Sequence, residues 1–296
     1  MFDGFLNVNK PPRVTSHDVV NGVRRLLRGV DRKIKVGHAG TLDPLADGVL
    51  VVCLGRATRL SDFVMHAPKG YQVVARLGQT TDTYDADGSV INVRAYDHVT
   101  AHDVVRLFPE FTGAIMQRPP AYSAIKQGGR KLYELARSGQ LVEAEPRLVQ
   151  IHRLELMAFE LPHVVLNVEC GAGTYIRSLV HDIGQRLGVG AHVLSLTRTF
   201  SGAFWLRDSL RLEQISAPEE LLPHLVAPAD ALTAYARVQA SPAQAADLAH
   251  GRAVAFEHEL TNPVMIYDEA WQLIAVAEWR DQRLYPRKVF IDDTLS

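Results

Sequence analysis

A glycine-rich loop around an aspartate is the stretch best suited to chemistry, Gly37-His38-Ala39-Gly40-Thr41-Leu42-Asp43-Pro44-Leu45-Ala46-Asp47-Gly48. Pro44 disfavours helical backbone angles at the preceding residue, so the turn itself restrains the Asp43 side chain. The glycines allow backbone angles and close approaches that a β-carbon would forbid. A carboxylate restrained in this way, just before the apolar run 49–54, is suited to act as a nucleophile. Asp-Pro pairs are also common in ordinary turns, so the loop alone leaves a purely structural role open.

Residues 171–184 predict a second stretch that could belong to a site, the start of a helix with Arg177 in its first turn. Four apolar residues recur there at helical spacing: Ile176, Leu179, Val180 and Ile183. Thr174 is a reasonable N-cap for this helix. Arg177 falls outside the apolar stripe, at the helix end where the dipole favours negative charge. We therefore expect Arg177 either to have a functional partner or to lie in solvent.

These two stretches belong to a series of motifs that occurs in the same order in one enzyme family. The series comprises the Asp43 loop, K-G-Y and R-L-G at residues 69–78, T-D-T-x-D-A-D-G at residues 81–88, and G-T-Y-I-R at residues 173–177. With these motifs the sequence resembles the tRNA pseudouridine synthase B family, and the resemblance covers roughly residues 5–205. Members of that family isomerise a uridine to pseudouridine in the T-loop of tRNA, at position 55.

The resemblance implies roles for the charged residues of the site. Asp43 is the implied nucleophile, and Arg177 would face it, keep it ionised and orient it. Asp85, in the T-D-T-x-D-A-D-G segment, would pair with a basic group near the site. Lys10 belongs to an N-K-P match that supports the fold more than the chemistry, and it is included among the substrate-binding residues.

The resemblance also implies a pocket for a uridine that is flipped out of the RNA. Tyr71 would lie against the target base, although a strand tyrosine is commonly a core aromatic. Tyr175 and Leu196 would form walls of the pocket. His38 would stack in the space that the flipped base leaves, which offsets part of the few kcal/mol that unstacking costs. Its alternative role is that of a turn histidine hydrogen-bonded to backbone.

The implied reaction needs no cofactor. It breaks the bond from uracil N1 to the sugar and makes a bond from C5 to the same sugar carbon, with no oxidation and no hydrolysis. Consistently, the sequence has no dinucleotide-binding or P-loop glycine motif. We expect no metal either, because Arg94 occupies the position of the glutamate that would complete a calcium loop at residues 82–94.

The distribution of charge permits RNA binding but does not demand it. The formal net charge is −1, whereas RNA-binding domains are often strongly basic. Residues 1–35 carry eight basic and three acidic side chains, and residues 111–133 carry four basic and no acidic ones. Residues 255–296 hold eight acids against four bases. A basic face formed by the first two segments remains compatible with tRNA as the partner, through its T-arm.

The periodicity of the sequence predicts an α+β fold. Strands are expected at residues 5–9, 49–54, 69–78, 149–157 and 163–168, and helices from a Thr15–Asp18 capping box, over 101–108 and over 131–138. We predict a mixed-sheet pseudouridine synthase catalytic domain over residues 1–236, with helices broken by prolines over 207–236. Short strands and one helix over residues 237–296 resemble a small PUA-like RNA-binding β-barrel.

Composition points to a cytoplasmic monomer. No apolar run is long enough to span a membrane, and no basic segment precedes an apolar one at the N-terminus. Only Cys53 and Cys170 are present, which favours a reducing compartment and cannot form a zinc cage. The sequence implies no protein partner, and no apolar stripe is left over to mark a dimer.

Two other functions remain open at this point. A retaining glycoside hydrolase also uses a carboxylate at a sugar carbon, and Asp47 would be its second carboxyl group. A non-catalytic RNA-binding protein would use Asp43 only to shape the loop. Release of free uracil would favour the former, and pseudouridine formation by an Asp43→Asn variant would favour the latter. The sequence does not decide whether the nucleophile attacks the sugar carbon or the uracil ring.

Overall fold

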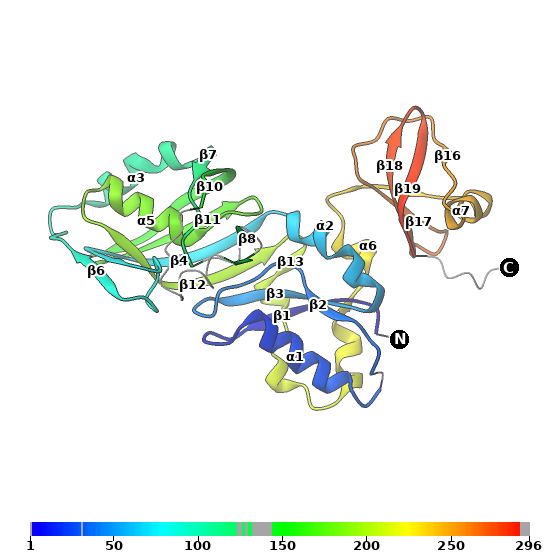
Figure 1. The fold of residues 1–296 in the computed structure, drawn as a ribbon, viewed down its shortest axis with the longest axis horizontal. Helices are drawn as coiled ribbons and strands as arrows, with labels where there is room; N and C mark the ends of the chain where they lie inside the picture. Colours follow the sequence, from blue (N-terminus) through cyan, green and yellow to red (C-terminus); the bar gives the residue numbers. More distant parts are fainter. Residues whose placement is uncertain (1, 31, 123–125, 128–129, 132–143, 291–296) are drawn as a thin grey trace.

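One large mixed sheet forms most of the molecule (Figure 1). The computed structural model describes residues 2–30, 32–122, 126–127, 130–131 and 144–290. From edge to edge the sheet contains β14 (Leu225–Val226), β1 (Gly4–Lys10), β3 (Asp47–Leu54), β12 (Ala191–Ser201), β4 (Lys69–Leu77), β11 (His163–Cys170), β10 (Arg147–Glu160) and β7 (Gly113–Gln117). Two short strands extend it, β2 (Val36–His38) beside β3 and β13 (Phe204–Trp205) beside β12. The β12–β3 pair is parallel and the other pairs are antiparallel, so the predicted mixed sheet is confirmed.

The β12–β3 contact joins the two halves of this sheet. The N-terminal half contains β1, β2 and β3 with helix α1 (Ser16–Leu27), and the other half contains β4, β11, β10 and β7 with α3 (Ala101–Leu107) and α5 (Ile176–Arg186) (Figure 1). Gly48 makes the close approach of β3 to β12 possible. Its φ is +97°, and a Cβ there would collide with the carbonyl oxygen of Arg198 on β12.

Helix α1 begins as the sequence predicts. Thr15 is its N-cap, and the backbone N–H of Asp18 donates to the Thr15 hydroxyl while the Asp18 carboxylate accepts from the Thr15 N–H. Its inner face buries four aliphatic side chains, Val19, Val20, Val23 and Leu27. After β3 the chain forms a 3-10 helix, η1 (Gly55–Leu60), which continues into α2 (Ser61–His66). No helix among the described residues is long and apolar enough to cross a bilayer.

The remaining elements of this part are short. They are β5 (Gln79–Thr81), β6 (Val90–Val93), η2 (Phe108–Phe111), β8 (Lys126–Gln127), β9 (Arg130–Lys131), η3 (Leu206–Asp208), η4 (Leu212–Gln214), η5 (Pro218–His224) and α6 (Pro228–Ala231). The helices expected over residues 207–236 are thus short, three to seven residues each. Pro218 and Pro228 stand at the starts of η5 and α6, and Pro223 lies inside η5, where it removes a hydrogen-bond donor. The predicted helix over 131–138 lies outside the described residues apart from residue 131, which belongs to β9.

The C-terminal part is a small five-stranded sheet with one helix. Its strand order is β15 (Ala236–Gln239), β17 (Val264–Tyr267), β18 (Leu273–Arg280), β19 (Arg283–Val289) and β16 (Val254–Ala255), and α7 (Pro242–Ala249) contacts β16, β18 and β19. This sheet is consistent with the small PUA-like domain that the sequence predicts. A buried cluster joins it to the large sheet, with Phe5 and Val51 on one side and Met265 and Tyr267 on the other.

Candidate active site

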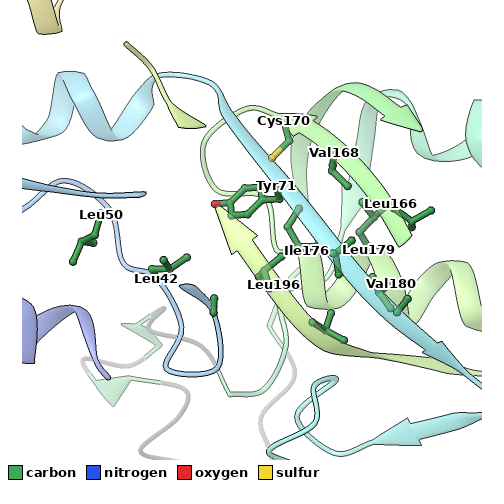
Figure 2. Close-up of a cluster of buried hydrophobic side chains, with 14 of the residues drawn as sticks. Leu42, Leu50, Tyr71, Leu166, Val168, Cys170, Ile176, Leu179, Val180 and Leu196 are labelled. Carbon is green, nitrogen blue, oxygen red and sulfur yellow. The ribbon is translucent and has the colours of Figure 1, made fainter. Parts of the chain in front are cut away.

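The Asp43 loop connects β2 to β3, and side chains from three other elements hold its peptide groups in place. The Ser16 hydroxyl donates to Leu42 O at 3.0 Å and accepts from Leu42 N at 2.9 Å. Arg198 Nη2 donates to Thr41 O at 2.7 Å. The Leu42 side chain is buried in the main hydrophobic core (Figure 2). Polar and apolar contacts therefore fix the backbone on the N-terminal side of Asp43, which is the pre-organisation that a reacting group needs.

Lys10 supports the same loop from the end of β1. Its ammonium group is buried and donates to Pro11 O at 2.8 Å, Val14 O at 2.6 Å and Pro44 O at 3.4 Å. Burial lowers the pKa of Lys10 to about 8, and the charges of Asp47 and Asp43 oppose that shift. All three of its N–H donors are directed at the backbone. Lys10, which the sequence placed among substrate-binding residues, thus lies beneath the loop and can act on substrate only through it.

Arg177 links Asp43 to a second carboxylate. Its Nε lies 2.9 Å from Asp43 Oδ2, a charge contact in which the N–H does not point at the oxygen. Its Nη1 donates to Asp85 Oδ2 at 3.2 Å. The side chains of Arg177 and Asp85 are each 7% exposed, whereas that of Asp43 is 34% exposed. The guanidinium is therefore enclosed, and the Asp43 carboxylate is the member of the trio that faces open space.

Backbone carbonyls complete the surroundings of Arg177. Nη1 also donates to Thr83 O at 3.1 Å, and Nη2 donates to Tyr122 O at 3.1 Å. Burial raises the pKa of Asp85, while the hydrogen bond from Thr83 and the charge of Arg177 oppose the rise. Of the two alternatives that the sequence left for Arg177, the structure shows a partner rather than solvent, and it consists of two carboxylates from separate loops.

Tyr71 lies at the edge of the core, facing the Asp43 loop (Figure 2). It pairs across β4 and β12 with Arg198, whose Nε donates to the Tyr71 hydroxyl at 3.2 Å and whose guanidinium carbon lies 5.6 Å from the ring centroid. Burial raises the pKa of Tyr71, so its phenol is neutral in neutral solution. Leu196, two residues before Arg198, is buried on the same strand beside Tyr71 and Ile176 (Figure 2).

Tyr175 is held at the start of α5 by a buried glutamine. Gln117 Oε1 accepts from Tyr175 N at 2.8 Å, and Gln117 Nε2 donates to Tyr175 O at 3.0 Å. The Arg147 guanidinium carbon lies 5.0 Å from the Tyr175 ring centroid. The predicted N-cap at Thr174 is wrong: helix α5 begins at Ile176 with Tyr175 as N-cap, and the Thr174 hydroxyl donates to Gly171 O at 3.0 Å. Tyr175 provides no side-chain cap, and Gln117, distant in sequence, instead binds both backbone groups of the N-cap residue.

His38 lies half-buried on β2, beside the loop that it precedes. Among the described residues, its buried Nδ1 makes no hydrogen bond. Burial lowers the pKa of His38, and the charges of Arg198 and His17 lower it further, while a backbone hydrogen bond with Gly40 opposes the shift. The ring is therefore neutral in neutral solution, which suits stacking on bases rather than ion pairing.

Arg198 is the most important residue of the site that the sequence did not assign. It is 2% exposed, and besides Tyr71 and Thr41 it donates to Val49 O at 3.1 Å. One signal could have found it. Leu196 is expected to face the core, and side chains two apart on a strand share a face, so Arg198 has to be buried with its charge engaged.

We expect Arg198→Met to lower the free energy of unfolding by about 2–4 kcal/mol, because three buried acceptors lose a charged donor. Urea unfolding measures this loss. The matched control is Arg207→Met, which removes an arginine whose side chain is 73% exposed and should change stability by less than about 0.5 kcal/mol. Equal stability of the Arg198→Met variant and the native protein would show that these buried contacts contribute nothing.

The sequence matches two family descriptions that together span residues 24–234. Residues 24–176 match "TruB family pseudouridylate synthase (N terminal domain)", and residues 177–234 match "tRNA pseudouridylate synthase B C-terminal domain". The tRNA pseudouridine synthase B of Symbiobacterium thermophilum is 48% identical over 257 residues, which cover 86% of this chain and 83% of that protein. That of Clostridium kluyveri is 38% identical over 294 residues, which cover 98% and 100%.

Solved structures resemble the whole chain. A "Crystal Structure of a Cbf5-Nop10-Gar1 Complex" contains a chain with a TM-score of 0.72 and 27% identity, covering 97% of this chain and 85% of that one. A "Structure of H/ACA RNP bound to a substrate RNA containing 2'-deoxyuridine" matches with a TM-score of 0.72 and 26% identity over 98% and 85%. Sequence and fold agree, and the predicted resemblance is confirmed: the chain belongs to the TruB family of pseudouridylate synthases.

Proposed function

We propose that this chain isomerises uridine to pseudouridine in the T-loop of tRNA, at position 55, with Asp43 as the nucleophile on a flipped-out base. Its membership of the TruB family supports the reaction and the substrate. One observation carries the assignment to Asp43. Its carboxylate is the exposed member of a trio whose other two members, Arg177 and Asp85, are enclosed.

Arg177 positions the nucleophile in this proposal. Its guanidinium lies 2.9 Å from Asp43 Oδ2, and this contact orients the carboxylate. Because the Arg177 N–H does not point at the carboxylate oxygen, that oxygen keeps lone pairs available for attack. Asp85 fixes the guanidinium from the other side. The charge needed for the reaction is thus held in place before the substrate arrives.

Tyr71, Leu196 and Tyr175 are proposed to hold the uracil while its bond to the sugar is exchanged. Tyr71 and Leu196 lie on adjacent strands beside the loop, and Gln117 holds the backbone of Tyr175. Detached uracil has to turn without escaping, and we propose that these two aromatic rings and one aliphatic side chain enclose it. Lys10 is proposed to act through the loop, by its hydrogen bond to Pro44 O.

His38 is proposed to occupy the gap that the flipped uridine leaves in the RNA. We expect His38→Ala to reduce kcat/KM by about 10- to 100-fold, because stacking of an aromatic ring on a base contributes roughly 1–3 kcal/mol. Turnover of unmodified tRNA measures the loss, with Asp43→Ala assayed in parallel. A loss as large as that of Asp43→Ala would contradict the separate roles of stacking and attack.

We further propose the domain organisation and setting of the enzyme. Residues 1–236 form the catalytic domain, and residues 237–296 form a PUA-like domain that adds contacts to the T-arm. We propose a monomer in the cytoplasm. The basic segments 1–35 and 111–133 are the expected source of phosphate contacts, since the C-terminal segment is acidic.

The test is incubation with unmodified tRNA, followed by mapping of pseudouridine at single-nucleotide resolution. We expect one new pseudouridine, at position 55. A site outside the T-loop, or no pseudouridine, would overturn the proposed substrate. Release of free uracil would instead identify a glycoside hydrolase in which Asp47 serves as the second carboxyl group.

A further inference from the structure

Arg13 has a backbone conformation that favours glycine. Its φ is +64°, and it follows Pro11 and Pro12 in the turn between β1 and α1. A positive φ after a turn proline is the position that type II turns usually give to glycine, because a β-carbon is strained there. An arginine at this position therefore carries a conformational cost that its side chain does not relieve locally.

Hydrogen bonds fix this turn against the nucleophile loop. The backbone N–H of Arg13 donates to Pro44 O at 2.6 Å, one peptide beyond Asp43. The ammonium group of Lys10 donates hydrogen bonds to Pro11 O and Val14 O, the two ends of the turn. The backbone of Arg13 is thereby held against the residue that follows Asp43, and its surroundings fix the unusual φ.

The guanidinium of Arg13 is exposed and, across the described ranges, makes neither a hydrogen bond nor an ion pair. Two nearby carboxylates are engaged elsewhere, since Asp18 accepts from Thr15 and Asp43 contacts Arg177. His17, four residues after Arg13, is also exposed, and its charge lowers the pKa of His38. Among the described residues, Arg13 is thus a cation without a partner, in the turn that contacts the nucleophile loop.

We propose that Arg13 binds a backbone phosphate that flanks the uridine held over Asp43. This inference rests on the proposed function. A nucleotide turned out onto Asp43 carries a phosphate on each side, and the arginine fork matches phosphate geometry with two parallel hydrogen bonds. In this proposal, the contact with the phosphate compensates for the conformational cost of Arg13 at a positive φ.

Arg13→Gly tests this proposal, because glycine adopts the positive φ freely and removes only the side chain. We expect KM for unmodified tRNA to rise about three- to tenfold, with kcat unchanged. The slope of log affinity against log salt should become shallower by roughly 0.7–0.9, the value for one lost phosphate contact. The melting temperature should not fall. A purely structural role would leave KM and the salt slope as they are, and would overturn the proposal.

Two further variants separate position from net charge. Arg13→Asn removes one positive charge, and asparagine tolerates the positive φ. Arg106→Asn removes one positive charge from α3, in the half of the molecule distant from α1 (Figure 1). We expect the KM and salt-slope changes for Arg13→Asn only, and equal changes for both variants would refute a specific contact. The slope is measured by tRNA binding without turnover, so an enzyme that binds but forms no pseudouridine would contradict the proposed function and not the role of Arg13.

Discussion

Replacing Asp43 with asparagine is expected to reduce pseudouridine formation by about 10⁴-fold or more, the scale of loss when a nucleophile is removed. Asparagine has the same shape, so Pro44, Leu42 and the hydrogen bonds that hold the loop stay in place. Binding of tRNA should persist, because Asp43 contributes no positive charge to it. Stability should change by less than about 1 kcal/mol, since the side chain is partly exposed and Arg177 retains Asp85. Single-turnover formation of pseudouridine measures the loss.

Asp47→Asn is the matched control for this experiment. It removes the same charge from the same loop, and its carboxylate begins β3 rather than facing Arg177. We expect this variant to keep most of its activity. Full activity of Asp43→Asn would remove the proposed nucleophile and leave Asp43 a structural role. Complete loss in Asp47→Asn would implicate a second carboxyl group, as in the glycoside hydrolase alternative.

Arg177→Met is expected to damage both stability and chemistry. Removal of the guanidinium leaves the buried Asp85 carboxylate without its cation, which costs about 3–5 kcal/mol of unfolding free energy. It also removes the group that orients Asp43, so we expect turnover to fall by about 10²- to 10³-fold. Urea unfolding and single-turnover kinetics measure the two effects separately. A variant with native stability and native turnover would show that the trio of charges is incidental.

The double variant Arg177→Met, Asp85→Asn distinguishes these two effects. Removing the stranded charge should restore part of the lost stability and none of the lost activity. The pH dependence of the single variant gives a second check. In that variant burial raises the pKa of Asp85 in the folded state, and Arg177 no longer opposes the rise. The contribution of Asp85 to the free energy of unfolding is therefore greatest at low pH, and it declines as pH rises above the unfolded pKa of about 3.9. The double variant should lack that decline.

The sequence predicts the parts of this site that local chemistry encodes. The Asp43 loop is visible because proline and glycine restrict the backbone in a recognisable way, and the capping box of α1 lies within four residues. Arg177 is conspicuous because a cation at a helix start needs an explanation. The resemblance to the family then joins these parts, and the structure places Arg177 in contact with both Asp43 and Asp85.

The parts that the sequence misses depend on contacts between distant residues. Gln117 binds the backbone of Tyr175 across 58 positions, and Arg198 donates to Thr41 O across 157. No local pattern marks such pairs. For the same reason the N-cap at Thr174 is mispredicted, because a local rule assumes that a neighbouring side chain will satisfy the first N–H of the helix. Lys10 is visible in its motif, but only the fold shows that its ammonium group faces the backbone.

The most direct measurement is a crystal structure of the Asp43→Asn enzyme bound to an unmodified T-arm RNA hairpin. We expect the target uridine to lie outside the base stack with its ring against Tyr71. The side chain of residue 43 should then lie within about 3.5 Å of the sugar C1′ or of the uracil ring, the separation of reacting atoms before attack. A uridine that stays stacked in the RNA loop, or one bound with residue 43 remote from both its sugar and its ring, would contradict attack by Asp43.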